Sequence, residues 1–115
     1  MVKNFLLILF FVFLLLSCTK SPQNTVAAIK SKNLESQMID SYKAGVEALE
    51  KGDALFAIKK FNEAELLYPQ SQWAPKSVLM ASYSYYMQDY YSLAIQNLKR
   101  FFNTYPKDKN IAYAH

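Results

Sequence analysis

The sequence has almost none of the residues from which common catalytic and metal sites are built. Its 115 residues include one cysteine and one histidine, Cys18 and His115, so no Cys/His cluster with metal-ligand spacing exists. One cysteine also excludes a disulfide within the chain. The two glycines, Gly45 and Gly52, cannot form a phosphate-binding loop. We therefore expect a protein that is not an enzyme and that holds no cofactor or metal.

The charged residues do not form a recognisable binding or catalytic site either. The formal net charge is +4, but the lysines are scattered and do not form the basic stripe of a nucleic-acid-binding protein, so no nucleic-acid partner is expected. Glu63 and Glu65 are two residues apart, so on a helix they point in different directions. We expect both to be solvated charges.

Scarce glycine and proline favour long helices. No stretch alternates between apolar and polar residues over the length of a strand, and the four prolines fall near the ends of helical patterns. We therefore expect an all-α fold. The pattern predicts helices at about 34–51, 54–68, 72–88 and 90–105, and the start of a fifth at 110. Ser71 is expected to cap the third, and Gly45 to have a packing role inside the first.

The first 17 residues are expected to be a signal peptide. Lys3 precedes an apolar run from Phe5 to Leu16, which ends in Ser17. The alternative is a membrane-spanning helix, for which the run is too short, since a span needs about 20 apolar residues.

Leu15-Leu16-Ser17-Cys18 resembles the lipobox of bacterial lipoproteins. That resemblance implies cleavage before Cys18 and covalent lipid on it, and Thr19 in the second position then favours the outer membrane. The alternative is a free thiol. Residues 18–33 are expected to be a lipidated cysteine and a flexible tether, although the apolar patch at 26–29 could instead form a short helix or a docking strand.

The most informative feature is an internal repeat with a spacing of 37 residues. The stretch from Ala57 to Pro69 returns from Ala94 to Pro106, and repetition at such a period indicates a solenoid. The pattern resembles the tetratricopeptide (TPR) repeat. We expect TPR-like repeats at 34–69 and 70–106 and the start of a truncated third at 107–115. Solenoids need about three repeats, so we expect an N-terminal fragment that is marginally stable alone and prone to associate. The apolar stripe around Leu98 and Phe101 is then expected to face solvent.

Together, the lipobox, the short tether and the repeats that close in Tyr-Pro resemble the BamD (ComL) family of outer-membrane lipoproteins. The resemblance is carried by residues 68–71, 81–86, 101–106 and 110–114. It implies a lipid-anchored TPR scaffold on the periplasmic face of the outer membrane, which helps to recognise, assemble and insert outer-membrane proteins. The implied partners are a BamA-like barrel subunit, the other lipoproteins of the complex, and the C-terminal segments of unfolded outer-membrane proteins.

In TPR proteins the first helix of each repeat lines a concave groove, so the resemblance also implies a binding site for an extended peptide. By position its residues are Tyr42, Val46, Leu49, Glu50, Lys76, Leu79, Tyr83, Tyr86 and Met87. The alternative for Tyr83 and Tyr86 is ordinary packing between helices. Trp73 is expected to fill the interface between repeats.

Two other functions stay open. One is a CpoB-like periplasmic TPR protein that coordinates envelope constriction, although residues 19–33 lack the heptads of its usual coiled coil. The other is a lipoprotein subunit that holds a cell-wall hydrolase or synthase.

Overall fold

The computed structural model describes residues 1–4 and 23–115, and in them the fold is all-α, as predicted. No strand occurs in the described residues, and none of their helices is long and apolar enough to cross a membrane. The signal run and Cys18 lie outside the described residues. The helices are α2 (Gln23–Glu50), α3 (Ala54–Leu67), α4 (Trp73–Met87), α5 (Tyr91–Thr104) and α6 (Ile111–Ala114).

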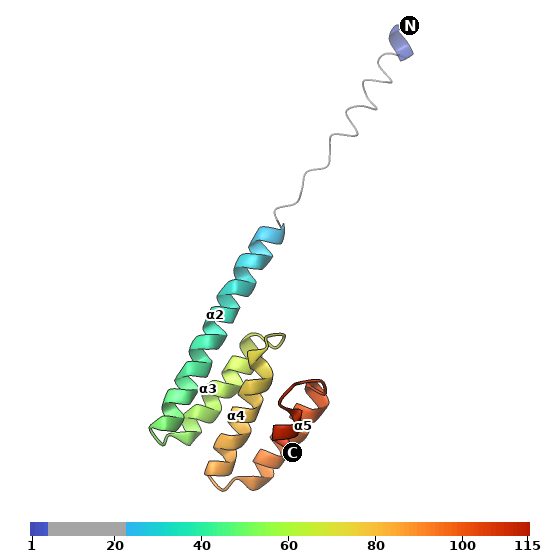
Figure 1. Ribbon diagram of the computed structural model, residues 1–115. Helices are drawn as coiled ribbons and strands as arrows, with labels where there is room; N and C mark the ends of the chain where they lie inside the picture. The colour runs from blue at the N-terminus through green and yellow to red at the C-terminus, as the bar shows by residue number, and fades with distance from the viewer. Residues whose placement is uncertain (5–22) are drawn as a thin grey trace.

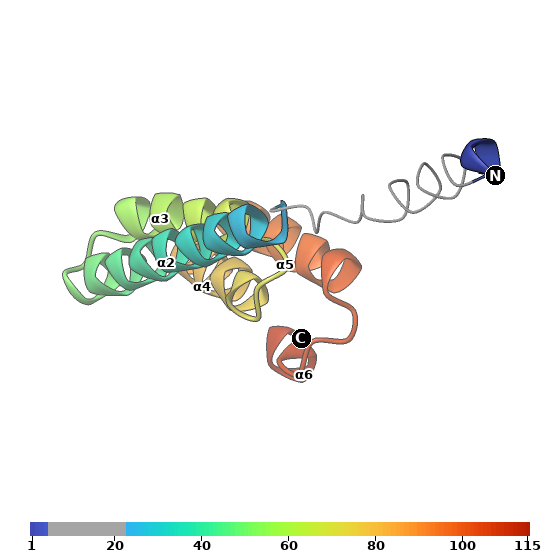
Figure 2. The same cartoon turned by 90° about the horizontal axis from the view of Figure 1, so that it is seen from above.

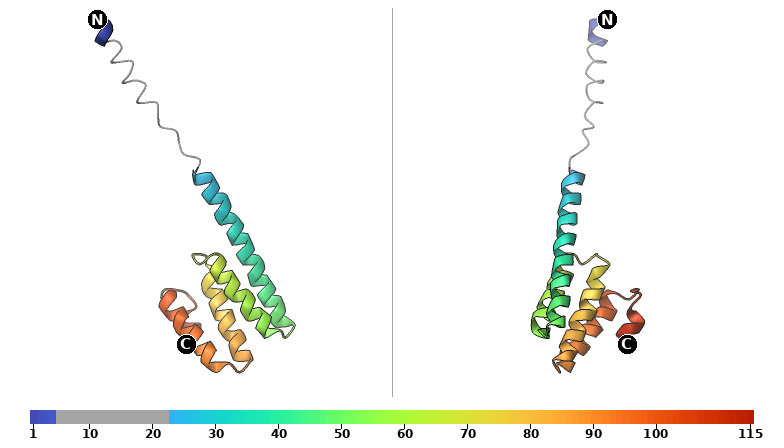
Figure 3. Two further views of the ribbon diagram at one scale, coloured as in Figure 1. Left: turned by 180° about the vertical axis from the view of Figure 1, so that it is seen from behind. Right: turned by 60° about the vertical axis from the view of Figure 1, so that its left-hand side comes forward.

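The helices stack in the order of the chain. α3 packs against both α2 and α4, and α4 packs against α5, so the α2–α3 and α4–α5 pairs lie side by side as two units of a TPR-like solenoid (Figures 1 and 3). The short α6 lies apart from the α2–α3 pair, where a further unit would begin (Figure 2).

Local chemistry sets the ends of the helices close to the predicted positions. Gly52 takes a φ of +81° in the turn after α2, and the Asp53 carboxylate accepts the Phe56 N–H at 3.0 Å to cap α3. The Ser71 hydroxyl accepts the Trp73 N–H at 3.0 Å, which confirms the predicted cap. Asp89 makes the next turn with a φ of +59°.

The start of α2 corrects the prediction of a flexible tether at 18–33 for residues 23–33, the part that the structure describes. The helix begins at Gln23 rather than near residue 34, and its first turns project beyond the rest of the bundle (Figure 1). No glycine or proline lies between Gln23 and Ala44, and extending an existing helix costs far less than nucleating one. Val26 and Ile29 are exposed on this projecting segment.

The core of the first unit is built on one close approach between helices. Phe61 of α3 is fully buried with Ala48, Ala57 and Ala81, and a Cβ added to Gly45 of α2 would lie 2.7 Å from Phe61 Cε1. Such a distance is shorter than atoms tolerate, so Gly45 has the packing role that the sequence predicts.

A second core lies between α4, α5 and α6. Val78, Phe101 and Ala114 form it. The fully buried Phe101 corrects the expectation that the apolar stripe of the last long helix faces solvent there, because the turn of α6 covers it. Ile95 and Tyr91 of the same stripe do remain exposed.

The buried Glu65 corrects a third expectation, that this residue is a solvated charge. Its side chain is only 11% exposed. Arg100 Nη1 and Nη2 donate to its two carboxylate oxygens at 2.6 and 2.8 Å, and the Tyr105 hydroxyl donates to it at 3.0 Å. The three side chains join α3 to the end of α5. Burial, followed by the charge of Glu65, raises the pKa of Tyr105 to about 12.

Glu63 is tied to the fold in a different way. It accepts hydrogen bonds from Ser41 of α2 at 3.0 Å and from Lys60 at 2.8 Å. The Lys60 bond, the Ser41 bond and the neighbouring positive charge lower the pKa of Glu63. Glu63 thus joins α3 to α2 within the first repeat, whereas Glu65 joins α3 to α5 of the second repeat.

Gly45→Ala should destabilise the protein by about 1–3 kcal/mol, because overpacking against Phe61 exceeds the gain of about 1 kcal/mol from helix propensity. Urea unfolding would measure it. At the equivalent positions the second repeat has Ser82 and Leu98, so Phe61→Leu should relieve the clash. The double variant should therefore lose less stability than the sum of its single variants. Strict additivity would contradict the close approach.

Arg100→Met should lower the free energy of unfolding by about 1–3 kcal/mol, because it leaves the buried Glu65 carboxylate with Tyr105 as its one remaining partner. The exposure of the Arg100 side chain, 43%, keeps the loss below that of a fully buried pair. Lys51→Met is the control. It breaks the exposed ion pair with Glu47 and should leave the urea midpoint of unfolding unchanged. Equal losses in both variants would contradict the network.

Candidate functional site

The first candidate site is a shallow depression between α2 and the start of α4, which we call the Trp73 hollow. It has a volume of about 510 Å³. Its lining residues are Ile39, Tyr42, Lys43, Val46, Glu47, Glu50 and Trp73.

Aromatic rings form the floor of the Trp73 hollow. The Tyr42 ring meets Trp73 edge-on at 5.2 Å and Phe61 at 5.4 Å between centroids. The Lys76 ammonium lies 4.3 Å from the centroid of the Trp73 ring, a cation–π distance. Burial raises the pKa of Tyr42, so its hydroxyl stays protonated at neutral pH. The floor therefore offers apolar area with one hydroxyl.

Charges of both signs surround that floor. Lys43, Glu47 and Glu50 lie among the lining residues, and all three are exposed on successive turns of α2. The Glu47 carboxylate accepts a hydrogen bond from Lys51, which lowers the pKa of Glu47. A ligand in the Trp73 hollow would thus place its apolar part on the rings and its polar part near either charge.

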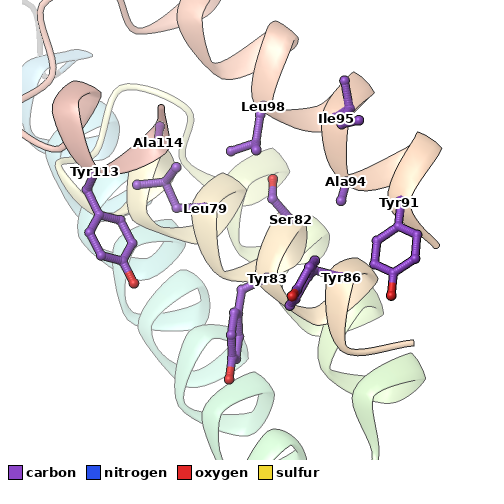
Figure 4. A pocket seen from close by; sticks show the side chains of 10 residues that line it. All are labelled: Leu79, Ser82, Tyr83, Tyr86, Tyr91, Ala94, Ile95, Leu98, Tyr113 and Ala114. Carbon is purple, nitrogen blue, oxygen red and sulfur yellow. The ribbon is translucent and has the colours of Figure 1, made fainter. Parts of the chain in front are cut away.

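The second candidate site is the α4–α5 cleft, which has a volume of about 540 Å³. Side chains from α4, α5 and α6 surround it (Figure 4). Its lining residues are Leu79, Ser82, Tyr83, Tyr86, Tyr91, Ala94, Ile95, Leu98, Tyr113 and Ala114. None of them is charged, which distinguishes the cleft from the Trp73 hollow.

Two of the five hydroxyl groups that line the cleft bond within the protein. The Ser82 hydroxyl donates to Val78 O at 2.8 Å and accepts from Asn97 at 2.9 Å. The Tyr91 hydroxyl donates to Asp89 at 2.6 Å. The hydroxyls of Tyr83, Tyr86 and Tyr113 are therefore the lining groups that could bond to the backbone of an extended ligand.

Seven of the nine residues predicted to line one groove lie at one or the other of these two depressions. Tyr42, Val46 and Glu50 line the Trp73 hollow, with Lys76 beside its tryptophan. Three more of the predicted residues line the α4–α5 cleft: Leu79, Tyr83 and Tyr86.

The other two predicted residues line neither depression. Leu49 packs against the first core, and Met87 is exposed at the end of α4. The Trp73 hollow also includes Ile39, Lys43, Glu47 and Trp73, none of which the sequence predicts at a binding site. The three- and four-residue steps from Ile39 to Glu50 are the signal that could have identified the α2 face.

The geometry defines a class of protein, a helical-repeat scaffold that presents aromatic depressions on its surface. In the described residues no group of three or more His, Cys, Asp or Glu side chains could hold a metal ion. Exposed apolar patches rimmed by polar residues are typical of protein, membrane or ligand interaction sites.

The comparisons with known proteins identify the family. Residues 34–115 match the family model described as YfiO, outer membrane lipoprotein, so the chain belongs to that family. The match covers both repeats and α6.

Two curated relatives are similar to this chain. The outer membrane protein assembly factor BamD of Caulobacter vibrioides is 36% identical over 73 residues, which are 64% of this chain and 24% of the relative. The protein of the same name from Rickettsia prowazekii is 27% identical over 85 residues, 74% of this chain and 34% of the relative. The chain thus spans about a quarter and a third of their lengths. No solved structure gave a significant match.

Proposed function

We propose that this chain is part of a lipid-anchored TPR scaffold for the assembly and insertion of outer-membrane proteins. The observation that supports it most directly is the family match over residues 34–115, together with two relatives named outer membrane protein assembly factor BamD. The proposed partners are a BamA-like barrel subunit and the other lipoproteins of the same complex.

The anchor is proposed to be covalent lipid on Cys18, with the protein on the periplasmic face of the outer membrane. The sequence around Cys18 supports this through its lipobox resemblance. Stable anchoring takes more than one acyl chain, and a cysteine with a new amino group after cleavage can carry lipid on both sulfur and nitrogen.

The client site is proposed to be the Trp73 hollow, with the C-terminal segment of an unfolded outer-membrane protein as its ligand. An aromatic side chain would lie on Trp73 and Tyr42, since aromatic pairs at such distances contribute about 0.5–1.5 kcal/mol beyond burial. Lys43 and Lys76 lie close enough to the rings to attract a terminal carboxylate. Of the residues predicted to line the groove, the proposed client site thus keeps Tyr42, Val46 and Glu50 of α2 and Lys76 of α4.

Peptide binding can be followed through Trp73, the only tryptophan in the chain. A synthetic peptide that ends in phenylalanine should change the tryptophan fluorescence in a saturable way. Tyr42→Ala should weaken binding about five-fold or more, the loss expected for one aromatic contact. Tyr90→Ala, on an exposed residue in neither depression, should bind like the wild type. Equal affinity of both variants, each with wild-type helix content, would contradict the site.

The anchor and the partners can be tested together in cells. The full chain should incorporate labelled fatty acid, fractionate with outer membranes and co-purify a BamA-like barrel subunit. Cys18→Ala should lose the label and the membrane fractionation. Equal labelling of both proteins would contradict lipidation at Cys18. Recovery of cell-wall or division enzymes without a barrel subunit would contradict the assembly role and favour the CpoB-like or enzyme-holding alternatives.

A further inference from the structure

We propose that Lys76 is the residue of the Trp73 hollow that selects ligands with a free C-terminal carboxylate. Without a ligand its ammonium lies on the Trp73 ring. When a ligand binds, the ammonium leaves that ring to an aromatic side chain of the ligand and bonds to the terminal carboxylate instead. This inference rests on the proposed client site and deepens it, because it names the chemical group that the site recognises and the side chain that recognises it.

The Lys76 ammonium occupies a surface that an aromatic ligand can use. It lies 4.3 Å from the centroid of the Trp73 ring, and Tyr42 meets the same ring edge-on at 5.2 Å. The backbone of Trp73 is held in place, since its N–H donates to Ser71 Oγ at 3.0 Å and its carbonyl accepts the Ser77 hydroxyl at 2.9 Å. A ligand ring that stacks on this face therefore displaces the ammonium and leaves the indole where it is.

Lys76 has no carboxylate partner within the described residues. None of their ion pairs includes it, and it is the single charged residue of α4. A cation–π contact at a partly exposed site is weak, whereas a hydrogen bond from an ammonium to a carboxylate is charge-assisted and stronger. A terminal carboxylate thus offers the displaced ammonium a better partner than the ring, and an uncharged terminus does not.

Lys43, the other basic residue that lines or borders the hollow, is less suited to this role. Asp40 lies three residues before it and Glu47 four residues after it, and residues at these spacings are neighbours on the surface of a helix. Neither cation–π contact in the described residues includes Lys43, so no ring positions its ammonium. Lys76, in contrast, starts from the ring on which the ligand is proposed to lie.

The acidic residues of the hollow lie toward its other end. Glu50 is eight residues after Tyr42, which is about 12 Å along the helix axis. Glu47 already accepts a hydrogen bond from Lys51 at 2.6 Å. A carboxylate beside Trp73 therefore avoids the repulsion that it would meet near Glu50. The same distribution of charge orients an extended ligand with its C-terminus at the tryptophan.

The internal repeat supports a role other than packing for this cation–π pair. Residues that shape the repeat recur 37 residues later, as the closing Tyr-Pro does. The counterparts of Trp73 and Lys76 at that spacing are Asn110 and Tyr113, which supply neither a cation nor a tryptophan ring. The TPR-like packing of a repeat thus does not require the pair, and recognition of a ligand gives a reason for it.

Two synthetic peptides that end in phenylalanine test the selection on the full chain, one with a free C-terminal carboxylate and one amidated. Followed by the fluorescence of Trp73, the free acid should bind at least about three-fold more tightly than the amide. Lys76→Met removes the charge and should make the two affinities equal, whereas Lys76→Arg should preserve the difference. Lys59→Met is the matched control, at an exposed lysine of α3 outside both depressions, and should also preserve it.

Nuclear magnetic resonance gives a second readout, of the displacement itself. A methylene group held against the face of an aromatic ring resonates upfield of its usual position. The ε-methylene signal of Lys76 should therefore be shifted upfield in the free protein and should lose that shift when the free acid binds.

Equal affinities of the two peptides for the wild type would overturn this inference and leave the client site in place. So would a preference for the free acid that survives in Lys76→Met, each variant having wild-type helical circular dichroism, or one that is lost in Lys43→Met but kept in Lys76→Met. A Lys76 signal that the bound acid leaves unchanged would also overturn it. If neither peptide bound, the proposed client site itself would be contradicted, and this inference with it.

Discussion

The contact between Gly45 and the Phe61 ring is the constraint on which the first repeat depends. Because glycine leaves no Cβ there, α2 and α3 approach closely enough for Phe61 to be fully buried. Tyr42 packs edge-on against that ring, and Trp73 packs edge-on against Tyr42. The position of the Trp73 hollow therefore follows from one missing methyl group on α2, through a row of three aromatic rings that ends at the surface.

The second repeat has the same pair of antiparallel helices, but a different contact holds them together. Ser82 takes the place of Gly45, and Asn97 of α5 bonds both to its hydroxyl at 2.9 Å and to Val78 O at 3.0 Å. Polar contacts thus fix α5 on α4 where an aromatic ring fixes α3 on α2. Arg100 extends this polar set, since it bonds to Asn97 at 2.9 Å and to Glu65 of the preceding repeat. Asn97 consequently holds α5 to α4 of its own repeat, and Arg100 holds the same helix to α3 of the preceding repeat.

The hydrophobic periodicity of the helices and the residues that form the turns between them made most of the fold predictable. Gly52, Ser71 and Asp89 mark turns by local chemistry that a short window of sequence contains, so α3, α4 and α5 were placed within two residues of their observed ends. The start of α2 was missed because the polar composition of residues 19–33 favours a tether, although nothing between Gln23 and Ala44 stops a helix and Ser21-Pro22 is a helix-start pattern. The burial of Glu65 was missed because its partner Arg100 lies 35 residues away. The division of the predicted groove depends on how successive helices pack, which a pattern along one helix does not contain.

The two depressions look alike in size but differ in what they can hold, and the difference is electrostatic. The Trp73 hollow combines rings with exposed lysine and glutamate side chains on α2, and charges at a rim guide a polar partner and set its orientation. The α4–α5 cleft has no charged lining residue, so it offers burial without orientation, as an interior surface does. A solenoid needs both kinds of surface, because each repeat must bind its neighbour through one face and leave another for its ligands.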